Sequence, residues 1–212
     1  MSRPFFSVIV PAHNSAEYIQ RGLQSIVSQS FTDYELIVVC DACTDNTKLW
    51  AHWYADDIGG KVLVTDFGMD GLARNAGIDA AEGYWLIFMD DDDWFLHEFV
   101  FQQLHDAAVD TDADMLVFDF VWKGRGYYRN AGGKTNIAVW SKCWRREIIG
   151  DTRFPAIPFT SDEPFMQEII KKQPRAVFMG MPMYYYNYMR KGSQTEVHAR
   201  PGGADSERQV ER

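Results

Sequence analysis

The chain has 212 residues, 46% of them hydrophobic, and a formal net charge of -9 at pH 7. This length and apolar content are enough for one domain with a substantial core. Because non-specific affinity for nucleic acid comes mostly from Lys and Arg, the acidic balance argues against a nucleic-acid partner.

The sequence contains no uninterrupted apolar run of 18 residues and no secretory leader pattern, so we expect no transmembrane segment and a cytoplasmic protein. Peripheral association with a membrane stays open. The three cysteines fit a reducing compartment. The C-x-x-C spacing of Cys40 and Cys43 can mean a redox pair, half of a zinc site, or two small turn residues, and no second C-x-x-C or His pair completes a tetrahedral site.

Short β-branched segments alternate with amphipathic segments in the first half of the chain. The expected strands are 6–10, 35–40, 61–64 and 84–89. The expected helices are one from a cap at Asn14 to about Gln29, one starting near Thr44, and one over 72–81. This alternation predicts an α/β fold, Rossmann-like, with a mostly parallel central sheet and helices on both faces.

The second half has a less regular pattern. We expect a helix over 97–108, a strand over 115–122, a loop over 123–134, helices over 137–149 and 163–172, and strands over 176–179 and 183–188. The last residues, 200–212, have few apolar anchors and are predicted to be a flexible tail.

Polar residues follow three of the expected strands. Asn14, Asp41 and the run Asp90 to Asp93 each come just after a strand end. In parallel sheets ligands bind outside the carboxyl ends of the strands, so these three segments should converge on one rim.

Four consecutive carboxylates repel one another and are tolerated in water, as helix caps or around a cation. On an extended strand end Asp90 and Asp92 would point the same way, roughly 6–7 Å apart. Carboxylate oxygens suit Mg²⁺ or Mn²⁺. The run therefore predicts a divalent metal site, with a solvated turn as the alternative.

These segments together resemble glycosyltransferase family 2. The matching stretches are Ser7-Val-Ile-Val-Pro-Ala-His-Asn14, Val38-Val-Cys-Asp-Ala-Cys-Thr-Asp-Asn-Thr47, Gly71-Leu-Ala-Arg-Asn-Ala-Gly77 and Phe88-Met-Asp-Asp-Asp-Asp93. They cover about the first half of the chain, in order and at family-like spacing. The resemblance implies a glycosyltransferase A fold and an inverting transfer of one sugar from a nucleotide diphosphate sugar to a hydroxyl acceptor, either a saccharide, a lipid-linked molecule or another compound.

The resemblance also implies roles for single residues. Pro11, Ala12 and Asn14 would line the donor pocket, Asp41 would accept a hydrogen bond from the base, and Arg74 would support that pocket or pair with Asp41. Asp90 and Asp92 would be ligands of Mn²⁺ or Mg²⁺, and Asp90 would also contact the donor. Asp91 would lie nearer the sugar or ribose.

In the second half, Ser161-Asp-Glu-Pro-Phe165 resembles the family's E-D-x-x-F, with Ser161 in place of the usual Glu. Asp162 then falls on the general base that removes the acceptor proton. An alternative is that Asp162 caps the helix that follows.

The segment from Tyr184 to Thr195 resembles a late family motif in which a basic loop closes over the diphosphate. Arg190 or Lys191 would make that contact, since Asn187 stands where Arg is common. A solvated basic loop is the alternative.

We therefore predict a single glycosyltransferase domain over 1–199, in which 1–95 bind the nucleotide sugar and 96–199 bind the acceptor. The alternatives are a catalytically silent sugar- or nucleotide-binding module and a sugar nucleotidyltransferase. The second would normally carry a Gly-rich basic phosphate loop after the first strand, where this chain has Pro11-Ala-His-Asn14.

Overall fold

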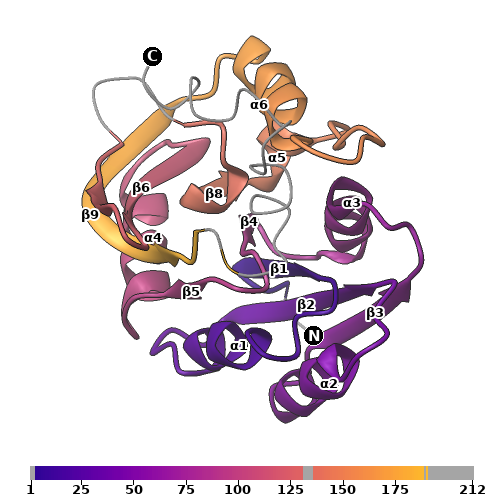
Figure 1. Cartoon of the computed structure of the whole chain (residues 1–212). Helices are drawn as coiled ribbons and strands as arrows, with labels where there is room; N and C mark the ends of the chain where they lie inside the picture. Colours follow the sequence, from indigo (N-terminus) through magenta and orange to yellow (C-terminus); the bar gives the residue numbers. More distant parts are fainter. Residues whose placement is uncertain (1–2, 131–135, 189, 191–212) are drawn as a thin grey trace.

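A nine-stranded sheet carries the fold in the computed structural model, which describes residues 3–130, 136–188 and 190 (Figure 1). The strands are β1 Phe6–Ala12, β2 Tyr34–Asp41, β3 Lys61–Thr65, β4 Trp85–Phe88, β5 Trp94–Phe95, β6 Met115–Trp122, β7 Gly126–Tyr128, β8 Lys142–Arg145 and β9 Ala176–Tyr186. The helices are α1 Ile19–Val27, α2 Thr47–Asp57, α3 Asp70–Ala80, α4 Val100–Asp110, the 3-10 turn η1 Val139–Ser141, α5 Arg146–Ile149 and α6 Asp162–Lys171.

The strand order is β3-β2-β1-β4-β8-β6-β9-β5, with β7 paired to β6. Strands β1 to β4 pair in parallel, as do β6 and β9, whereas β8 runs antiparallel to both β4 and β6. The predicted mostly parallel α/β architecture is confirmed in this mixed sheet.

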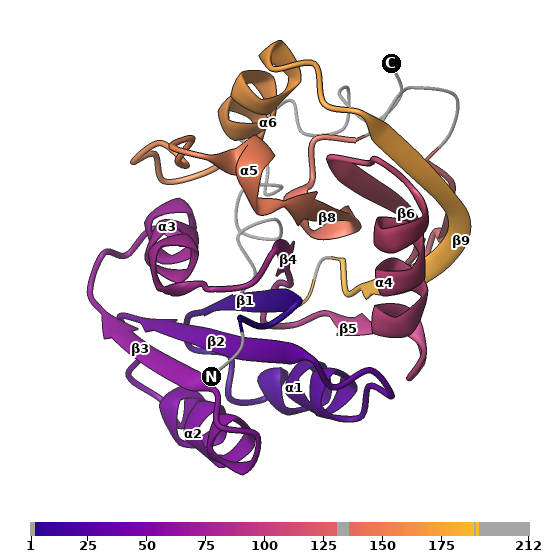
Figure 2. The ribbon, with the colours of Figure 1, turned by 180° about the vertical axis from the view of Figure 1, so that it is seen from behind.

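Two apolar cores cover the two faces of the sheet. In β1, Val8 and Val10 point into the core shared with α1, α2 and α4, whereas Ile9 points into the core shared with α3, α5 and α6. This period of two is expected for a strand buried on both faces. Figure 2 shows α1 and α2 on the side of the sheet opposite to α3.

Two glycines allow α3 and α1 to pack closely against neighbouring segments. A Cβ at Gly77 of α3 would lie 2.3 Å from Ile9 Cγ2, and one at Gly22 of α1 would lie 2.7 Å from the main-chain oxygen of Asp93. The first contact lets α3 lie directly on β1, and the second brings α1 against the aspartate run.

Several predictions of local structure were wrong. The loop expected over 123–134 contains strand β7, which pairs with β6. Residues 137–149 form η1, the central strand β8 and α5 rather than one helix, because Cys143 and Trp144 of β8 fill the two opposite cores. The segments 176–179 and 183–186 are one strand, β9, which bends at Gly180 with φ of 65°. Asn14 does not cap α1, which begins five residues later; Asn14 has φ of 47°, and its Oδ1 accepts a hydrogen bond from the amide of Thr44.

Among the described residues, none of the helices combines the length and the apolar character that crossing a bilayer demands.

Candidate functional site

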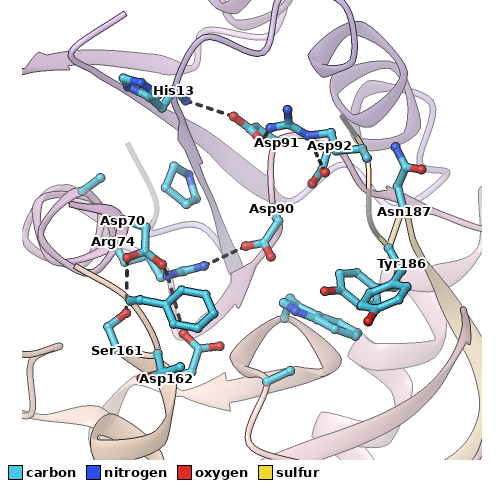
Figure 3. Close-up of a pocket in the computed structure, with 18 of the residues that line it drawn as sticks. His13, Asp70, Arg74, Asp90, Asp91, Asp92, Ser161, Asp162, Tyr186 and Asn187 are labelled. Carbon is cyan, nitrogen blue, oxygen red and sulfur yellow. Dashed lines mark hydrogen bonds and ion pairs between the residues drawn. The ribbon is translucent and has the colours of Figure 1, made fainter. Parts of the chain in front are cut away.

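A cavity of about 610 Å³ lies where β1, β2 and β4 end (Figure 3). Its other walls come from α3, β6, β7, η1, the start of α6 and the segment after β9. The predicted residues that line it are Pro11, Ala12, Asp41, Arg74, Asp90, Asp91, Asp92, Asp162 and Arg190. The fold thus brings together side chains that lie far apart in the sequence.

Two further predicted residues do not line the cavity in the described structure. Asn14 lies beside it, with its amide 3.3 Å from the ring of His13, which does line it. Lys191 lies outside the described residues.

The four aspartates form a turn and do not extend β4. The amide of Asp93 donates to the main-chain oxygen of Asp90 over 3.2 Å. The prediction that Asp90 and Asp92 share one direction on an extended strand was therefore wrong, because the chain turns directly after β4. Asp93 is fully buried and accepts a hydrogen bond of 2.7 Å from the amide of Asn187, which attaches the segment after β9 to this turn.

Arg74 lies at the centre of an acidic cluster in the cavity wall. It is only 4% exposed. Its Nη2 lies 2.7 Å from Asp90 Oδ1, while its Nη1 lies 2.5 Å from Asp70 Oδ2 and 3.5 Å from Asp162 Oδ1. Arg74 therefore links the aspartate run to the predicted general base, and it does not pair with Asp41.

Arg190 pairs with the other end of the aspartate run. Its Nε lies 2.5 Å from Asp92 Oδ2 and its Nη2 3.3 Å from Asp91 Oδ1. The guanidinium also lies over the ring of Tyr18, 4.7 Å from its centroid. Asp91 accepts a second bond, of 2.9 Å, from the amide of His13. Arg190 thus places a cation in the cavity beside the aspartate run.

Asp41 stabilises the loop that follows β3 through hydrogen bonds to its carboxylate. Its Oδ1 accepts hydrogen bonds from the Thr65 hydroxyl, over 2.8 Å, and from the Phe67 amide, over 2.7 Å. Its Oδ2 accepts one from the Met69 amide over 3.1 Å. A carboxylate has about four lone-pair sites, so Asp41 retains capacity for one more donor.

The two cysteines of the C-x-x-C are both free thiols beside this loop. Cys40 is buried, and the partly buried Cys43 donates from Sγ to the main-chain oxygen of Ala12 over 3.2 Å. Cys40 is a core residue of β2, whereas Cys43 lies in the turn that follows this strand.

Asp162 occupies the first position of α6, yet its carboxylate faces away from that helix. Oδ2 accepts a hydrogen bond of 3.1 Å from the amide of Val139, and Oδ1 faces Arg74. Capping of α6 is therefore not its role. Figure 3 shows Asp90 and Asp162 approaching Arg74 from different directions.

Burial raises the pKa of three of the carboxyls that line the cavity. It raises the pKa of Asp90 to about 6, against the opposing pull of Arg74. Burial and then the charge of Asp91 raise the pKa of Asp92 to about 7. Burial also raises the pKa of Asp162, while Arg74 and the Val139 amide act in the opposite direction. Each carboxyl keeps its proton to a higher pH than it would in water.

The donor set of Asp90 and Asp92 suits a hard divalent cation, because Mg²⁺ and Mn²⁺ prefer oxygen ligands. Among the described residues, however, no group of three or more His, Cys, Asp or Glu side chains is arranged to hold an ion by itself. An ion held by these two carboxylates would have to complete its shell with phosphate oxygens and water.

Aromatic rings form the wall of the cavity on the side of β6 and β9. Phe120 and Tyr128 are stacked with centroids 4.7 Å apart, and Trp140 and Tyr186 are stacked at 4.9 Å. These rings line the half of the cavity that lies beyond the aspartate run. This part of the cavity offers an aromatic surface to an apolar or ring-shaped ligand.

Two charged residues next to the site were not identified from the sequence. Asp70 precedes Arg74 by four residues on α3, and this i, i+4 spacing of opposite charges could have indicated their pairing. Lys142 is fully buried in β8 behind the cavity wall. Its segment was expected to be helical, and nothing in the sequence separates it from a surface lysine.

Comparison with known proteins gives a family match over most of the chain. The model of "Glycosyl transferase family 2" matches residues 7–182. TarS of Staphylococcus aureus, a poly(ribitol-phosphate) beta-N-acetylglucosaminyltransferase, is 30% identical over 88% of this chain and 36% of its own length. The glycosyltransferase GlyA of Streptococcus pneumoniae is 24% identical over 90% of this chain and 31% of its own length. The chain thus spans about a third of the length of these curated relatives.

Solved structures agree with the predicted fold. The crystal structure of S. aureus TarS 1-349 in complex with UDP-GlcNAc has a TM-score of 0.80 and 25% identity, covering 91% of this chain and 60% of that chain. The mannosyltransferase PcManGT of Pyrobaculum calidifontis, in complex with GDP-Man and Mn²⁺, has a TM-score of 0.71 and 20% identity, covering 93% of this chain and 60% of that chain. The predicted glycosyltransferase A type of fold is confirmed.

Proposed function

The chain belongs to glycosyltransferase family 2, and from this premise we propose that it transfers a single sugar from a nucleotide diphosphate sugar to a hydroxyl acceptor, with inversion and with Mn²⁺ or Mg²⁺. The observation that carries the proposal is the position of Asp162. This carboxylate, distant in sequence, lies across Arg74 from the aspartate run in the same cavity.

The proposed donor side is the rim formed by the ends of β1, β2 and β4. Pro11 and Ala12 would contact the nucleotide through main-chain groups, and Asp41 would accept a hydrogen bond from the base. Arg190, which now pairs with Asp91 and Asp92, would turn to the diphosphate when the donor binds. Charge supports this exchange, because a guanidinium binds phosphate as well as carboxylate oxygens.

In the proposed reaction the acceptor hydroxyl gives its proton to Asp162 as its oxygen attacks the anomeric carbon. The bond from that carbon to the diphosphate breaks, and its electron pair leaves with the diphosphate. Asp162 must be unprotonated, so the Arg74 guanidinium and the Val139 amide help by opposing the effect of burial on its pKa. A bound Mn²⁺ or Mg²⁺, held by Asp90 and Asp92, would neutralise charge on the leaving group.

The proposed division of tasks largely follows the chain within one domain. Residues 1–95 bind the donor, joined by Arg190 at the diphosphate, and 96–199 otherwise bind the acceptor. The aromatic wall belongs to the second half. A saccharide or a lipid-linked acceptor would be held there, with its hydroxyl directed at Asp162.

UDP is the first nucleotide to test, because the TarS complex contains UDP-GlcNAc. Isothermal titration of UDP, GDP, TDP and CDP, each with and without Mn²⁺, should give binding for at least one of them that strengthens with the metal. Absence of metal-dependent binding for all four would remove the proposed donor site.

Turnover separates an enzyme from a silent binding module. We expect release of UDP from UDP-GlcNAc when Mn²⁺ and a panel of neutral saccharides and alkyl glycosides are present. Binding without turnover of any donor that binds would favour the silent module instead.

A further inference from the structure

Lys142 places an ammonium group in the protein interior, with no exposure to solvent. Its Nζ lies 2.6 Å from the main-chain oxygen of Ala138, 2.9 Å from that of Asn136, 3.1 Å from Ser141 Oγ and 3.3 Å from Asn136 Oδ1. A buried charge is tolerated only with such complete hydrogen bonding. The lysine therefore serves as the polar centre of a turn.

All four acceptors belong to one short segment, residues 136–141, which precedes Lys142 directly. The segment is bonded to itself as well: Asn136 Oδ1 accepts from the Ala138 amide over 2.9 Å and from the Ser141 hydroxyl over 3.2 Å. Its conformation thus depends on the ammonium group, because two of its main-chain oxygens converge on that group.

The same segment holds the proposed base. The amide of Val139, which shares a peptide unit with the Ala138 oxygen that Lys142 binds, donates to Asp162 Oδ2 over 3.1 Å. The segment also carries Trp140, whose ring is stacked between Tyr184 at 4.8 Å and Tyr186 at 4.9 Å. A displaced segment would move both the base and some of the aromatic wall.

The charge of Lys142 also affects Asp162, in addition to these hydrogen bonds. The groups that face Asp162 are Arg74 and Asp70 from α3, Asp90 after β4, and Lys142 from β8. Lys142 lowers the pKa of Asp162, in the same direction as Arg74. Burial lowers the pKa of Lys142 itself to about 7, so it carries its charge in the acid range where Asp162 takes up a proton.

We propose that Lys142 is a positioning residue for the transfer reaction: by holding segment 136–141, its ammonium group fixes and electrostatically supports Asp162 as the base. This inference rests on the proposed function, since it concerns the base of that reaction. It assigns Lys142 no contact with either substrate.

The test compares Lys142→Met with wild type in the release of UDP from UDP-GlcNAc, with Mn²⁺ and the acceptor that gives turnover. We expect a fall in kcat of about 10- to 100-fold, since small misplacements of a catalytic group have such effects, with unchanged calorimetric affinity for UDP. The acid limb of kcat should move to higher pH, because loss of a positive charge raises the pKa of Asp162 and the base is then protonated further up the pH scale.

Cys143→Ala is the matched control, because Cys143 is the next residue of β8, is equally buried, and faces the core rather than the base. It should lower the melting temperature and leave the acid limb where it is. If Lys142→Met does not fold, Asn136→Ala replaces it; this variant keeps the ammonium group but loosens the segment, and should lower kcat with unchanged UDP affinity.

A Lys142→Met enzyme with wild-type kcat and pH profile would overturn the inference. So would a fall in kcat matched by Cys143→Ala with an unmoved acid limb, which would mean that Lys142 only stabilises the fold. In the fallback case, wild-type kcat in Asn136→Ala overturns it. Failure of the proposed function looks different: Asp162→Asn would then retain turnover.

Discussion

Replacement of Arg74 by Met should destabilise the protein strongly and in a pH-dependent way. Arg74 is buried between Asp70, Asp90 and Asp162, and its guanidinium contacts all three. Met retains most of the apolar stem but none of the charge. The variant therefore leaves three carboxylates next to one another without their common cation.

The magnitude follows from the burial of the partners. Removing one member of a buried ion pair typically costs about 3–5 kcal/mol, because the remaining charge stays desolvated. The side chains of Asp70, Asp90 and Asp162 are 26%, 26% and 19% exposed, so water can solvate them to some extent. We therefore expect a loss at the lower end, about 3 kcal/mol in the free energy of unfolding above neutral pH.

Lower pH should reduce this loss. Burial already raises the pKa of Asp90 to about 6 and raises that of Asp162, and removal of Arg74 takes away a charge that lowers both. In the variant the folded state thus binds more protons than the unfolded state, so stability is present at low pH and is lost as pH rises through the folded-state pKa values.

Urea unfolding at about pH 5 and about pH 8 measures the effect, with denaturation followed by circular dichroism. Arg153→Met is the control, because Arg153 pairs with Asp79 over 2.8 Å with side chains 36% and 64% exposed. Such a surface pair contributes roughly 1 kcal/mol or less. Two results would contradict this prediction. One is a loss of unfolding free energy in Arg74→Met that is no larger than in Arg153→Met at the higher pH. The other is a larger loss in Arg74→Met at the lower pH than at the higher.

Three further outcomes can be measured directly. Gly77→Ala should lower the free energy of unfolding by about 1–3 kcal/mol, measured in urea, because its Cβ would lie 2.3 Å from Ile9 Cγ2; unchanged stability would contradict the close packing. Asp41→Ala should lower the free energy of unfolding by about 1–3 kcal/mol, because the amides of Phe67 and Met69 lose their acceptor. The variant should also bind UDP more weakly in calorimetry, and full UDP affinity would exclude Asp41 from the donor pocket. Addition of EDTA should weaken UDP binding and lower the melting temperature in the presence of UDP, and excess Mn²⁺ should restore both; indifference to EDTA would argue against a metal-bound diphosphate.

Much of the proposed donor side could be predicted from the sequence, because it depends on local patterns. The β-branched runs around Val8 and Val38 predict buried strands, and polar residues after parallel strands meet at one rim of a sheet. Asp41 and Asp90 lie at that rim as expected. The strand over 115–122 was also placed at its observed bounds.

The proposed acceptor side depends on contacts that the sequence does not display. Strand β8 has only four residues, too few for its period to be distinguished from that of a helix, and it becomes a strand because β4 and β6 offer hydrogen bonds on both sides. The contact of Arg74 with Asp162 joins α3 to α6, 88 positions along the chain. The proposed role of Lys142 likewise depends on the hydrogen bonds between its ammonium group and the segment before it, which the sequence does not display.

The two carboxylates on either side of Arg74 are proposed to have different tasks: Asp90 belongs to the donor and metal side, and Asp162 removes the acceptor proton. The most direct test measures UDP affinity with Mn²⁺ and UDP release from UDP-GlcNAc in Asp162→Asn and Asp92→Asn. We expect Asp162→Asn to bind UDP as wild type does and to lose turnover, whereas Asp92→Asn should lose the metal-dependent component of UDP binding. Equal loss of binding in both variants, or turnover retained in Asp162→Asn, would contradict this division of tasks.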